Sequence, residues 1–229
     1  MSERVMLLTG ASSGIGAAIA HQAAAANYRV VLAARNQGPL DELAQALGGH
    51  ERAMTATCDV AEWNDQEAMV AAALERFGRI DAVVANVGFG AARGFTSETP
   101  EHWRDMILTN VLGVALTIRA SIDAIRESKG HFVLTGSVAG HRALAGSVYS
   151  ATKWAVTGLA EGLRQELNGT GARTTLISPG AVDTPFFDNP PAFEALQAED
   201  VARAVMYALS QPEHVDTNQI LIRSTAQEL

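Results

Sequence analysis

The chain has 229 residues, with 17 basic and 25 acidic side chains and a formal net charge of −8. This acidic balance argues against nucleic-acid binding, which needs a basic surface. Hydrophobic residues make up 48% of the chain and charged residues only 18%, a composition that excludes intrinsic disorder. At this length we expect one domain over residues 1–229.

Cysteine, histidine and apolar residues narrow the class of protein further. Cys58 is the single cysteine, so no intramolecular disulfide can form, which fits a reducing compartment. The six histidines lack metal-ligand spacing, and we expect no metal site. No apolar stretch reaches the roughly 18 residues of a membrane helix, and the run at residues 5–8 is too short for a signal peptide. The sequence predicts a soluble cytoplasmic protein that binds neither membrane nor nucleic acid.

Short strand-like segments alternate with helical patterns along the chain. Most of them are continuously apolar, as strands are when helices cover both faces of a parallel sheet. The alternation predicts an α/β fold: one Rossmann-like, doubly wound parallel sheet with right-handed crossovers and helices on both faces. The predicted strands cover residues 4–8, 29–33, 53–57, 81–85, 131–135, 173–178 and 219–223.

The segments between the strands carry helix signals. Leu40, Leu43 and Leu47 share one helical face, and Thr99-Pro100 is typical of a helix start, with an N-cap threonine followed by proline. An irregular, proline-rich stretch at residues 179–191 indicates a loop, and we expect a short substrate loop or lid over residues 185–198. Helix ends are predicted at Gly48-Gly49, Gly78, Gly130 and Gly169.

A glycine-rich turn follows the first predicted strand and opens a helix. Its spacing is GxxxGxG, not the commoner GxGxxG. Glycine allows the tight turn and a close approach of backbone to a pyrophosphate, and the helix N-terminus adds free N–H groups. We expect a dinucleotide here; the alternative is a tight turn with no ligand. The predicted contacts are Gly10, Ser12, Ser13, Gly14, Ile15 and Gly16.

The end of the second predicted strand bears on the choice of dinucleotide. NAD-binding folds place Asp or Glu about 20 residues after the glycines, for the ribose 2′-hydroxyl. Here the strand ends Ala33-Ala34-Arg35, without a carboxylate. A guanidinium suits a 2′-phosphate, which is a strong bidentate acceptor. Arg35 therefore favours NADP(H), against the alternative of a solvated surface arginine.

Tyr149 and Lys153 lie at i, i+4 on one face of a predicted helix. A neighbouring cation favours tyrosinate, so Lys153 and an oxidised nicotinamide ring could together lower the phenol pKa from about 10 towards about 7. Tyr149 would then give a proton to a carbonyl oxygen or take one from an alcohol. The alternative is a half-buried tyrosine beside an exposed lysine.

Ser137 follows the fifth predicted strand, in Thr135-Gly136-Ser137. At the carboxyl end of a central strand it borders the crevice where such sheets bind ligands, and its hydroxyl could polarise a carbonyl group. A nucleophilic role is not expected, because the chain lacks a GxSxG elbow and an Asp/His set arranged for hydrolysis.

These residues together resemble the short-chain dehydrogenase/reductase family, over residues 9–223. The glycine turn is similar to the family's cofactor turn, and Asp59-Val60 to its adenine-pocket pair. The family's Asn-Ala-Gly reads Asn86-Val87-Gly88, which adds bulk, and Ser13 stands where NADP-preferring members carry a second basic residue. The similar active-site set is Asn110, Ser137, Tyr149 and Lys153, and the nicotinamide-contacting loop is Pro179, Gly180, Val182 and Thr184.

The resemblance implies an NADP(H)-dependent dehydrogenase or reductase acting on CH–OH groups, such as a ketone or aldehyde reductase or an alcohol dehydrogenase. It implies that Tyr149 is the acid/base, Ser137 orients the carbonyl, Lys153 binds the nicotinamide ribose, and Asn110 holds a water in a proton relay. Members usually pair through the helices that carry Asn110 and Tyr149, so we expect a homodimer or homotetramer. Close helix packing, between subunits or alternatively on the chain's own sheet, is permitted by Ala151, Ala155, Gly158 and Gly162.

The predicted pocket walls are mostly apolar, which favours a hydrophobic or aromatic carbonyl substrate. His141 or Arg142 could instead bind an acidic substrate, and the tail at residues 218–227 resembles members that reduce small carbonyls or oxidise hydroxy acids with NADP. The residues also leave open a non-catalytic NADP(H)-binding regulatory protein, and an enzyme that uses the same set for epimerisation or dehydration. The predicted walls are Val87, Phe89, Val138, His141, Leu144, Phe186 and Phe187.

Overall fold

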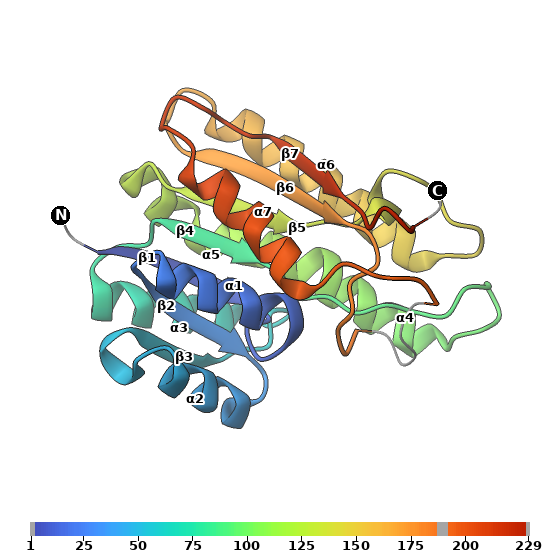
Figure 1. Cartoon of the computed structure of the whole chain (residues 1–229), viewed down its shortest axis with the longest axis horizontal. Coiled ribbons are helices and arrows are strands. Elements are labelled where there is room, and N and C mark those ends of the chain that lie inside the picture. Colours follow the sequence, from blue (N-terminus) through green and yellow to red (C-terminus); the bar gives the residue numbers. More distant parts are fainter. Residues whose placement is uncertain (1–2, 187–191, 228–229) are drawn as a thin grey trace.

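The computed structural model of the chain describes residues 3–186 and 192–227. Its centre is a seven-stranded parallel sheet with the strand order β3-β2-β1-β4-β5-β6-β7 (Figure 1). The predicted fold class is confirmed, and each predicted strand end lies within one residue of the observed end. The strands are β1 (Arg4–Thr9), β2 (Tyr28–Ala34), β3 (Ala53–Thr57), β4 (Ala82–Ala85), β5 (His131–Thr135), β6 (Arg173–Pro179) and β7 (Gln219–Ile222).

Two layers of helices flank the sheet (Figure 1). Side chains of β1 alternate between them: Met6 and Leu8 pack under one layer, and Val5 and Leu7 under the other. Burial on both faces is why the strands are continuously apolar. The first layer holds α1 (Gly14–Ala25), α2 (Gln37–Ala46) and α7 (Ala198–Ser210); the second holds α3 (Trp63–Phe77), α5 (Gly113–Ser128) and α6 (Val148–Leu167).

The helix ends follow the local sequence, with one difference. Thr99 Oγ1 accepts a hydrogen bond from the backbone of His102 at 3.1 Å, so α4 (Pro100–Ile107) begins as predicted. At the end of α5 the left-handed residue is Lys129, with φ of 52°, and not the predicted Gly130. Gly130 is required by packing, because a Cβ there would lie 2.5 Å from the Asp81 carbonyl oxygen.

One helix bears on the expectation about membranes. α4, a π-helical turn (Leu108–Leu112) and α5 run on as one helix, Pro100–Ser128, and an 18-residue window of it has a mean hydropathy of 1.4. Among the described residues this one helix is long and apolar enough to cross a membrane by length and composition. Polar residues interrupt this helix, so it contains no continuous apolar run of that length. In the fold, Val114 and Ile125 of α5 are buried against the sheet.

The carboxyl ends of the strands share one edge of the sheet, since all strands run in the same direction (Figure 1). The loops that leave β1, β2, β4, β5 and β6 start at this edge, and the described end of the chain also lies there. Ligands of open parallel sheets bind outside this edge, so the predicted site residues should lie there.

Candidate active site

The glycine turn lies at this edge, between β1 and α1. Gly10 and Gly14 have φ of +67° and +51°, a conformation that other residues rarely adopt. A Cβ on Gly16 would overlap the carbonyl oxygen of Gly10. Ser13 is the N-cap residue of α1, but its side chain makes no capping hydrogen bond, which leaves the first N–H groups of the helix for a ligand. The turn therefore fits a dinucleotide pyrophosphate.

Asn86 joins the glycine turn to the ends of β4 and β5. Its backbone N–H donates to Thr9 Oγ1 at 3.1 Å, and its Nδ2 donates to the Gly10 oxygen at 3.3 Å. Its Oδ1 accepts from Thr135 Oγ1 at 3.3 Å. The extra bulk of Val87 packs against the turn, since a Cβ on Gly10 would lie 3.2 Å from Val87 Cγ2.

Arg35 is exposed directly after β2. The adjacent strand brings Asp59 and Val60 to the same edge, because the backbone N–H of Cys58 donates to the Ala34 oxygen at 3.0 Å. The residues predicted to bind the 2′-phosphate and the adenine therefore lie on neighbouring strand ends.

The first turns of α6 bring Tyr149 and Lys153 together. Lys153 Nζ lies 5.8 Å from the centre of the Tyr149 ring and donates to the backbone oxygen of Thr135 at 2.8 Å. Lys153 is only 4% exposed, so the alternative of a solvated lysine is excluded. Ser137, on the loop after β5, hydrogen-bonds the phenol of Tyr149, and its Oγ also accepts from the backbone of Ala139 at 3.1 Å.

Burial shifts the pKa values of both groups. It raises the pKa of the Tyr149 phenol to about 12, against a smaller lowering by the hydrogen bond with Ser137. It lowers the pKa of the Lys153 ammonium to about 8. With the chain's own groups alone, the phenol pKa thus moves opposite to the lowering expected from the sequence, because desolvation of the phenolate dominates. At neutral pH the phenol is a proton donor.

Asn110 lies fully buried in the π-helical turn between α4 and α5. Its Oδ1 accepts from the backbone N–H of Phe89 at 3.0 Å, and its Nδ2 donates to the Phe89 oxygen at 2.9 Å and to Thr152 Oγ1 at 3.2 Å. The amide therefore ties the loop after β4 to α6, one residue from Lys153. The role of Asn110 in holding a relay water stays a prediction.

The loop after β6 returns to the glycine turn. A Cβ on Gly14 would lie 3.2 Å from Thr184 Cβ, so two segments predicted to bind the cofactor are in contact. Val182 is buried, and the backbone N–H of Gly180 donates to the Ile222 oxygen at 2.7 Å, which extends the pairing of β6 with β7.

One aromatic ring packs beside the reactive phenol. The Phe186 ring lies 5.7 Å from the Tyr149 ring, and a Cβ on Gly90 would lie 3.2 Å from the edge of Phe186. Phe89 meets His102 edge to face, with ring centres 5.3 Å apart. Phe186 thus lies beside the phenol, as a pocket wall would, whereas the Phe89 ring packs against His102 and its role as a wall stays a prediction.

The remaining predicted wall residues differ in burial and in their contacts. Val138 and Leu144 are partly buried, and Phe187 lies outside the described residues. His141 Nε2 lies 2.8 Å from Ser178 Oγ and 3.0 Å from Gln219 Nε2, so His141 is held by β6 and β7. This pairing argues against His141 as the group that binds an acidic substrate.

Two residues of the site carry no signal in the sequence. Thr135 supplies the backbone oxygen for Lys153, and Thr152 supplies the hydroxyl for Asn110. Both adjoin predicted residues, but their roles depend on contacts between distant segments and have no characteristic spacing.

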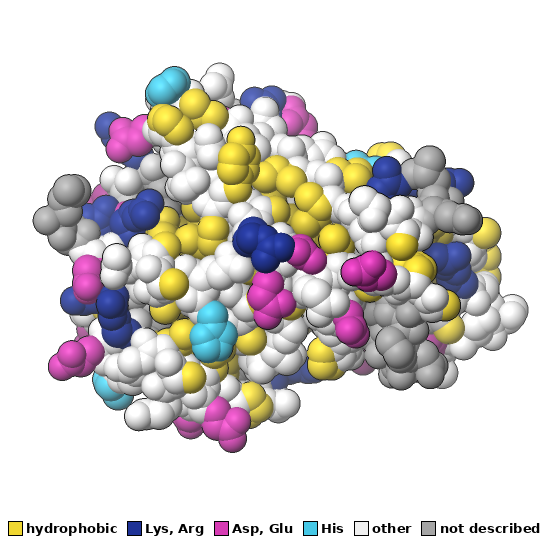
Figure 2. Space-filling view, in the orientation of Figure 1, with side chains coloured by type: hydrophobic (Ala, Val, Ile, Leu, Met, Phe, Trp, Pro, Cys, Tyr) yellow, Lys and Arg dark blue, Asp and Glu magenta, His cyan; other side chains and the backbone are white. Residues whose placement is uncertain are grey.

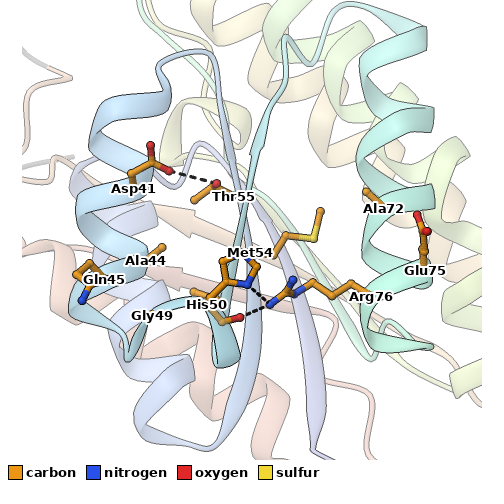
Figure 3. Close-up of a pocket in the computed structure, with 11 residues that line it drawn as sticks. Asp41, Ala44, Gln45, Gly49, His50, Met54, Thr55, Ala72, Glu75 and Arg76 are labelled. Carbon is orange, nitrogen blue, oxygen red and sulfur yellow. Dashed lines mark hydrogen bonds between the residues drawn. The ribbon is translucent and has the colours of Figure 1, made fainter.

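A separate cavity of about 630 Å³ lies at the β3 edge of the sheet, between α2 and α3 (Figure 3). Four of its lining residues form two pairs: Arg76 donates to His50, and Thr55 Oγ1 donates to Asp41 at 3.3 Å. β2, β1 and β4 separate it from β5, so it is distinct from the candidate active site.

Comparisons with known proteins identify the family of the chain. A family model described as short chain dehydrogenase matches residues 4–194. An uncharacterised oxidoreductase of Staphylococcus epidermidis is 37% identical over 227 residues, which cover 97% of this chain and 98% of that protein.

Two solved structures are similar over nearly the whole chain. An alcohol dehydrogenase from the archaeon Thermococcus sibiricus, complexed with 5-hydroxy-NADP, has a TM-score of 0.89 and 32% identity, covering 99% of this chain and 98% of that one. The closed form of a serine dehydrogenase, complexed with NADP+, has a TM-score of 0.93 and 31% identity, covering 98% of this chain and 96% of that one. The chain therefore belongs to the short chain dehydrogenase family of oxidoreductases.

Proposed function

We propose that the chain is an NADP(H)-dependent oxidoreductase that transfers hydride between nicotinamide and a ketone, aldehyde or alcohol substrate. The observation that carries this proposal is the Tyr149 phenol, hydrogen-bonded to Ser137 and adjacent to the buried Lys153, at the same sheet edge as the glycine turn. An acid, a carbonyl-orienting hydroxyl and a cation in this arrangement suit proton transfer at a carbonyl oxygen.

The dinucleotide would be held by residues that the fold already brings together. The tight turn at Gly16 and the uncapped N-terminus of α1 fit a pyrophosphate, and the exposed Arg35 fits a 2′-phosphate. The NADP-type cofactors in both similar structures support this choice. The residues proposed as the rest of the cofactor site are Asp59, Val60, Asn86, Gly88, Pro179, Gly180, Val182 and Thr184.

The side chains around the phenol have separate proposed roles in the reaction. When bound, the nicotinamide supplies or accepts the hydride. In reduction, Ser137 donates a hydrogen bond to the substrate carbonyl oxygen, and the Tyr149 phenol, protonated at neutral pH, gives that oxygen its proton. Lys153, held by Thr135, supplies a positive charge that favours the tyrosinate left behind. The ring of Phe186 packs beside the phenol ring and covers part of it.

The substrate we favour is a hydrophobic or aromatic carbonyl compound, because Phe186 borders the phenol and His141 is engaged by other residues. The second candidate is an NADP-dependent hydroxy-acid dehydrogenase, which the likeness to serine dehydrogenase favours. A carboxylate substrate would need a cation at the pocket, for which the exposed Arg142 is the nearest candidate in sequence.

A substrate screen tests the proposal. Purified protein is assayed with NADPH and NADH against aromatic ketones and aldehydes, and with NADP+ and NAD+ against secondary alcohols and hydroxy acids. We expect turnover with the NADP pair and faster reaction of aromatic ketones. Uniformly faster turnover of hydroxy acids would select the second candidate. NADPH binding without turnover would select a regulatory protein, and product formed without net redox an epimerase or dehydratase.

We further propose a cytoplasmic homodimer or homotetramer. A Cβ on Gly158 or Gly162 of α6 would meet nothing within 4 Å, so the chain's own packing does not require these glycines. Trp154 beside them is 48% exposed. These features support a second copy against α6 rather than close packing on the chain's own sheet. Apart from this face of α6, exposed apolar side chains also lie between α7 and β7, where Tyr207 and Leu221 are exposed (Figure 2).

A further inference from the structure

The end of the described chain folds back onto the loop after β6. Gln227 Oε1 accepts a hydrogen bond from the backbone N–H of Ala181 at 2.9 Å. This N–H belongs to the loop proposed to contact nicotinamide, and the tail that supplies the acceptor follows β7 at the carboxyl edge of the sheet (Figure 1). The contact joins residues 46 positions apart, so it is a product of the fold and not of local turn geometry.

Gly180 and Gln227 are matched in shape. A Cβ on Gly180 would overlap Gln227 Oε1 and would lie 3.0 Å from Arg223 Cγ. Gly180 does not have a positive φ, so steric space, and not backbone conformation, is what requires glycine here. The glycine leaves the space in which the amide of Gln227 reaches Ala181.

The same tail also holds the segment that precedes α7. Ser224 Oγ donates to the backbone oxygen of Glu194. That segment in turn pairs with the loop after β6: the backbone N–H of Leu196 donates to the Ala181 oxygen at 3.0 Å, and that of Asp183 donates to the Leu196 oxygen at 2.8 Å. Both backbone groups of Ala181 are therefore engaged, one by Gln227 and one by Leu196.

We propose that Gln227 is a positioning residue for the cofactor. Its side-chain oxygen fixes the N–H of Ala181 and thereby holds Val182 to Thr184 against Gly14 of the glycine turn, where Thr184 lies 3.2 Å from the site of a Gly14 Cβ. The inference requires one part of the proposed function, namely that this loop binds the dinucleotide. Gln227 does not touch Tyr149 or Ser137 in this arrangement, so it acts on cofactor affinity rather than on proton transfer.

The first test compares Gln227→Leu, which removes the acceptor, with Gln227→Glu, which keeps an oxygen at the same distance along the side chain. We expect Gln227→Leu to raise the Kd for NADPH, measured by fluorescence titration, about tenfold, while kcat at saturating NADPH stays within about threefold. Gln227→Glu should recover most of the affinity. Thr225→Val, on the exposed side of the same tail, is the matched control and should bind NADPH as the wild type does.

A measurement without cofactor distinguishes a local effect on the loop from a general loss of stability in the variant. Hydrogen exchange of the peptide containing Ala181 should be about tenfold faster in Gln227→Leu, while exchange of β5 stays unchanged. If β5 also exchanges faster, Gln227 supports the fold as a whole and the proposal is overturned.

A double-mutant cycle tests the matched pair directly. Gly180→Ala alone should weaken NADPH binding at least tenfold, because its methyl group displaces Gln227. Added to Gln227→Ala, the same change should cause much less further loss, since the overlap with Gln227 is gone and only the flexible Arg223 side chain remains close. Additive losses would refute the pairing. If the wild type binds no dinucleotide, the proposed function fails; if it binds NADPH and Gln227→Leu binds it equally well, only this inference fails.

Discussion

The Nζ of Lys153 donates to the backbone oxygen of Thr135 at 2.8 Å, and the hydroxyl of the same threonine donates to Asn86 at 3.3 Å. Asn86 in turn reaches the oxygen of Gly10 in the glycine turn. One run of hydrogen bonds therefore connects the lysine beside the reactive phenol with the turn proposed to hold the pyrophosphate. A change at any member should disturb both catalysis and cofactor binding.

Lys153 should make stability depend on pH. Burial lowers its pKa from 10.5 to about 8, so between these pH values the unfolded chain binds more protons than the folded one, and the free energy of unfolding rises with pH. The rise should be roughly 3 kcal/mol, at about 1.36 kcal/mol per pKa unit. Lys153→Met should remove this contribution, measured as the difference between wild type and variant in urea titrations at pH 7 to 10, because burial of Cys58 raises its pKa to about 12 and gives both proteins the opposite slope above pH 9. The exposed Lys129 is the matched control: Lys129→Met should keep the wild-type slope.

Tyr149→Phe should remove the proton donor and leave the cofactor site intact. We expect kcat for ketone reduction to fall by about 10²–10⁴, with the Kd for NADPH within about twofold of the wild type. Because burial raises the phenol pKa, alcohol oxidation, which needs the tyrosinate, should speed up as pH rises above neutrality. The residual activity of Tyr149→Phe should lose this pH dependence. Retention of the alkaline rise would assign the proton transfer to another group.

The fold and the order of the site motifs could be predicted from sequence because each depends on local patterns. The apolar strands, the Thr99 cap and the glycine turn each depend on residues that are close together in the sequence. All three lie where expected. The engagement of His141 by Ser178 depends on which strands become neighbours, and no spacing in the chain reveals it. The direction of the Tyr149 pKa shift likewise depends on burial, which a sequence pattern cannot measure.

Arg35→Asp should swing the dinucleotide preference. The guanidinium is exposed after β2, and a charge-assisted pair with a 2′-phosphate contributes about 1.5–3 kcal/mol. We expect the ratio of kcat/KM for NADP(H) over NAD(H) to fall at least tenfold, with added repulsion from the new carboxylate. Arg104→Asp, an equal charge change on the exposed side of α4, should leave the ratio as in the wild type. Unchanged selectivity in Arg35→Asp would remove the basis for preferring NADP(H).

Phe186 should determine selectivity between substrate classes. Its ring packs 5.7 Å from that of Tyr149, so an aromatic ketone at the phenol would share this wall. Phe186→Ala should raise KM for aromatic ketones about tenfold and leave KM for small hydroxy acids within about twofold. Phe95→Ala removes a ring that is 72% exposed and should alter neither value. Equal losses for both substrate classes in Phe186→Ala would mean that the ring supports the loop and does not select the substrate.

Assembly through α6 should be disrupted by a charge on its outer face. A Cβ on Gly158 would meet nothing within 4 Å, so Gly158→Glu fits its own chain and any effect on mass must come from a second copy. We expect light scattering at micromolar concentration to give a lower mass than the wild type. Gly38→Glu is the matched control, because a Cβ at Gly38 on α2 also meets nothing, and this variant should keep the wild-type mass. A wild type that is itself monomeric would show that the exposed Trp154 does not serve self-association.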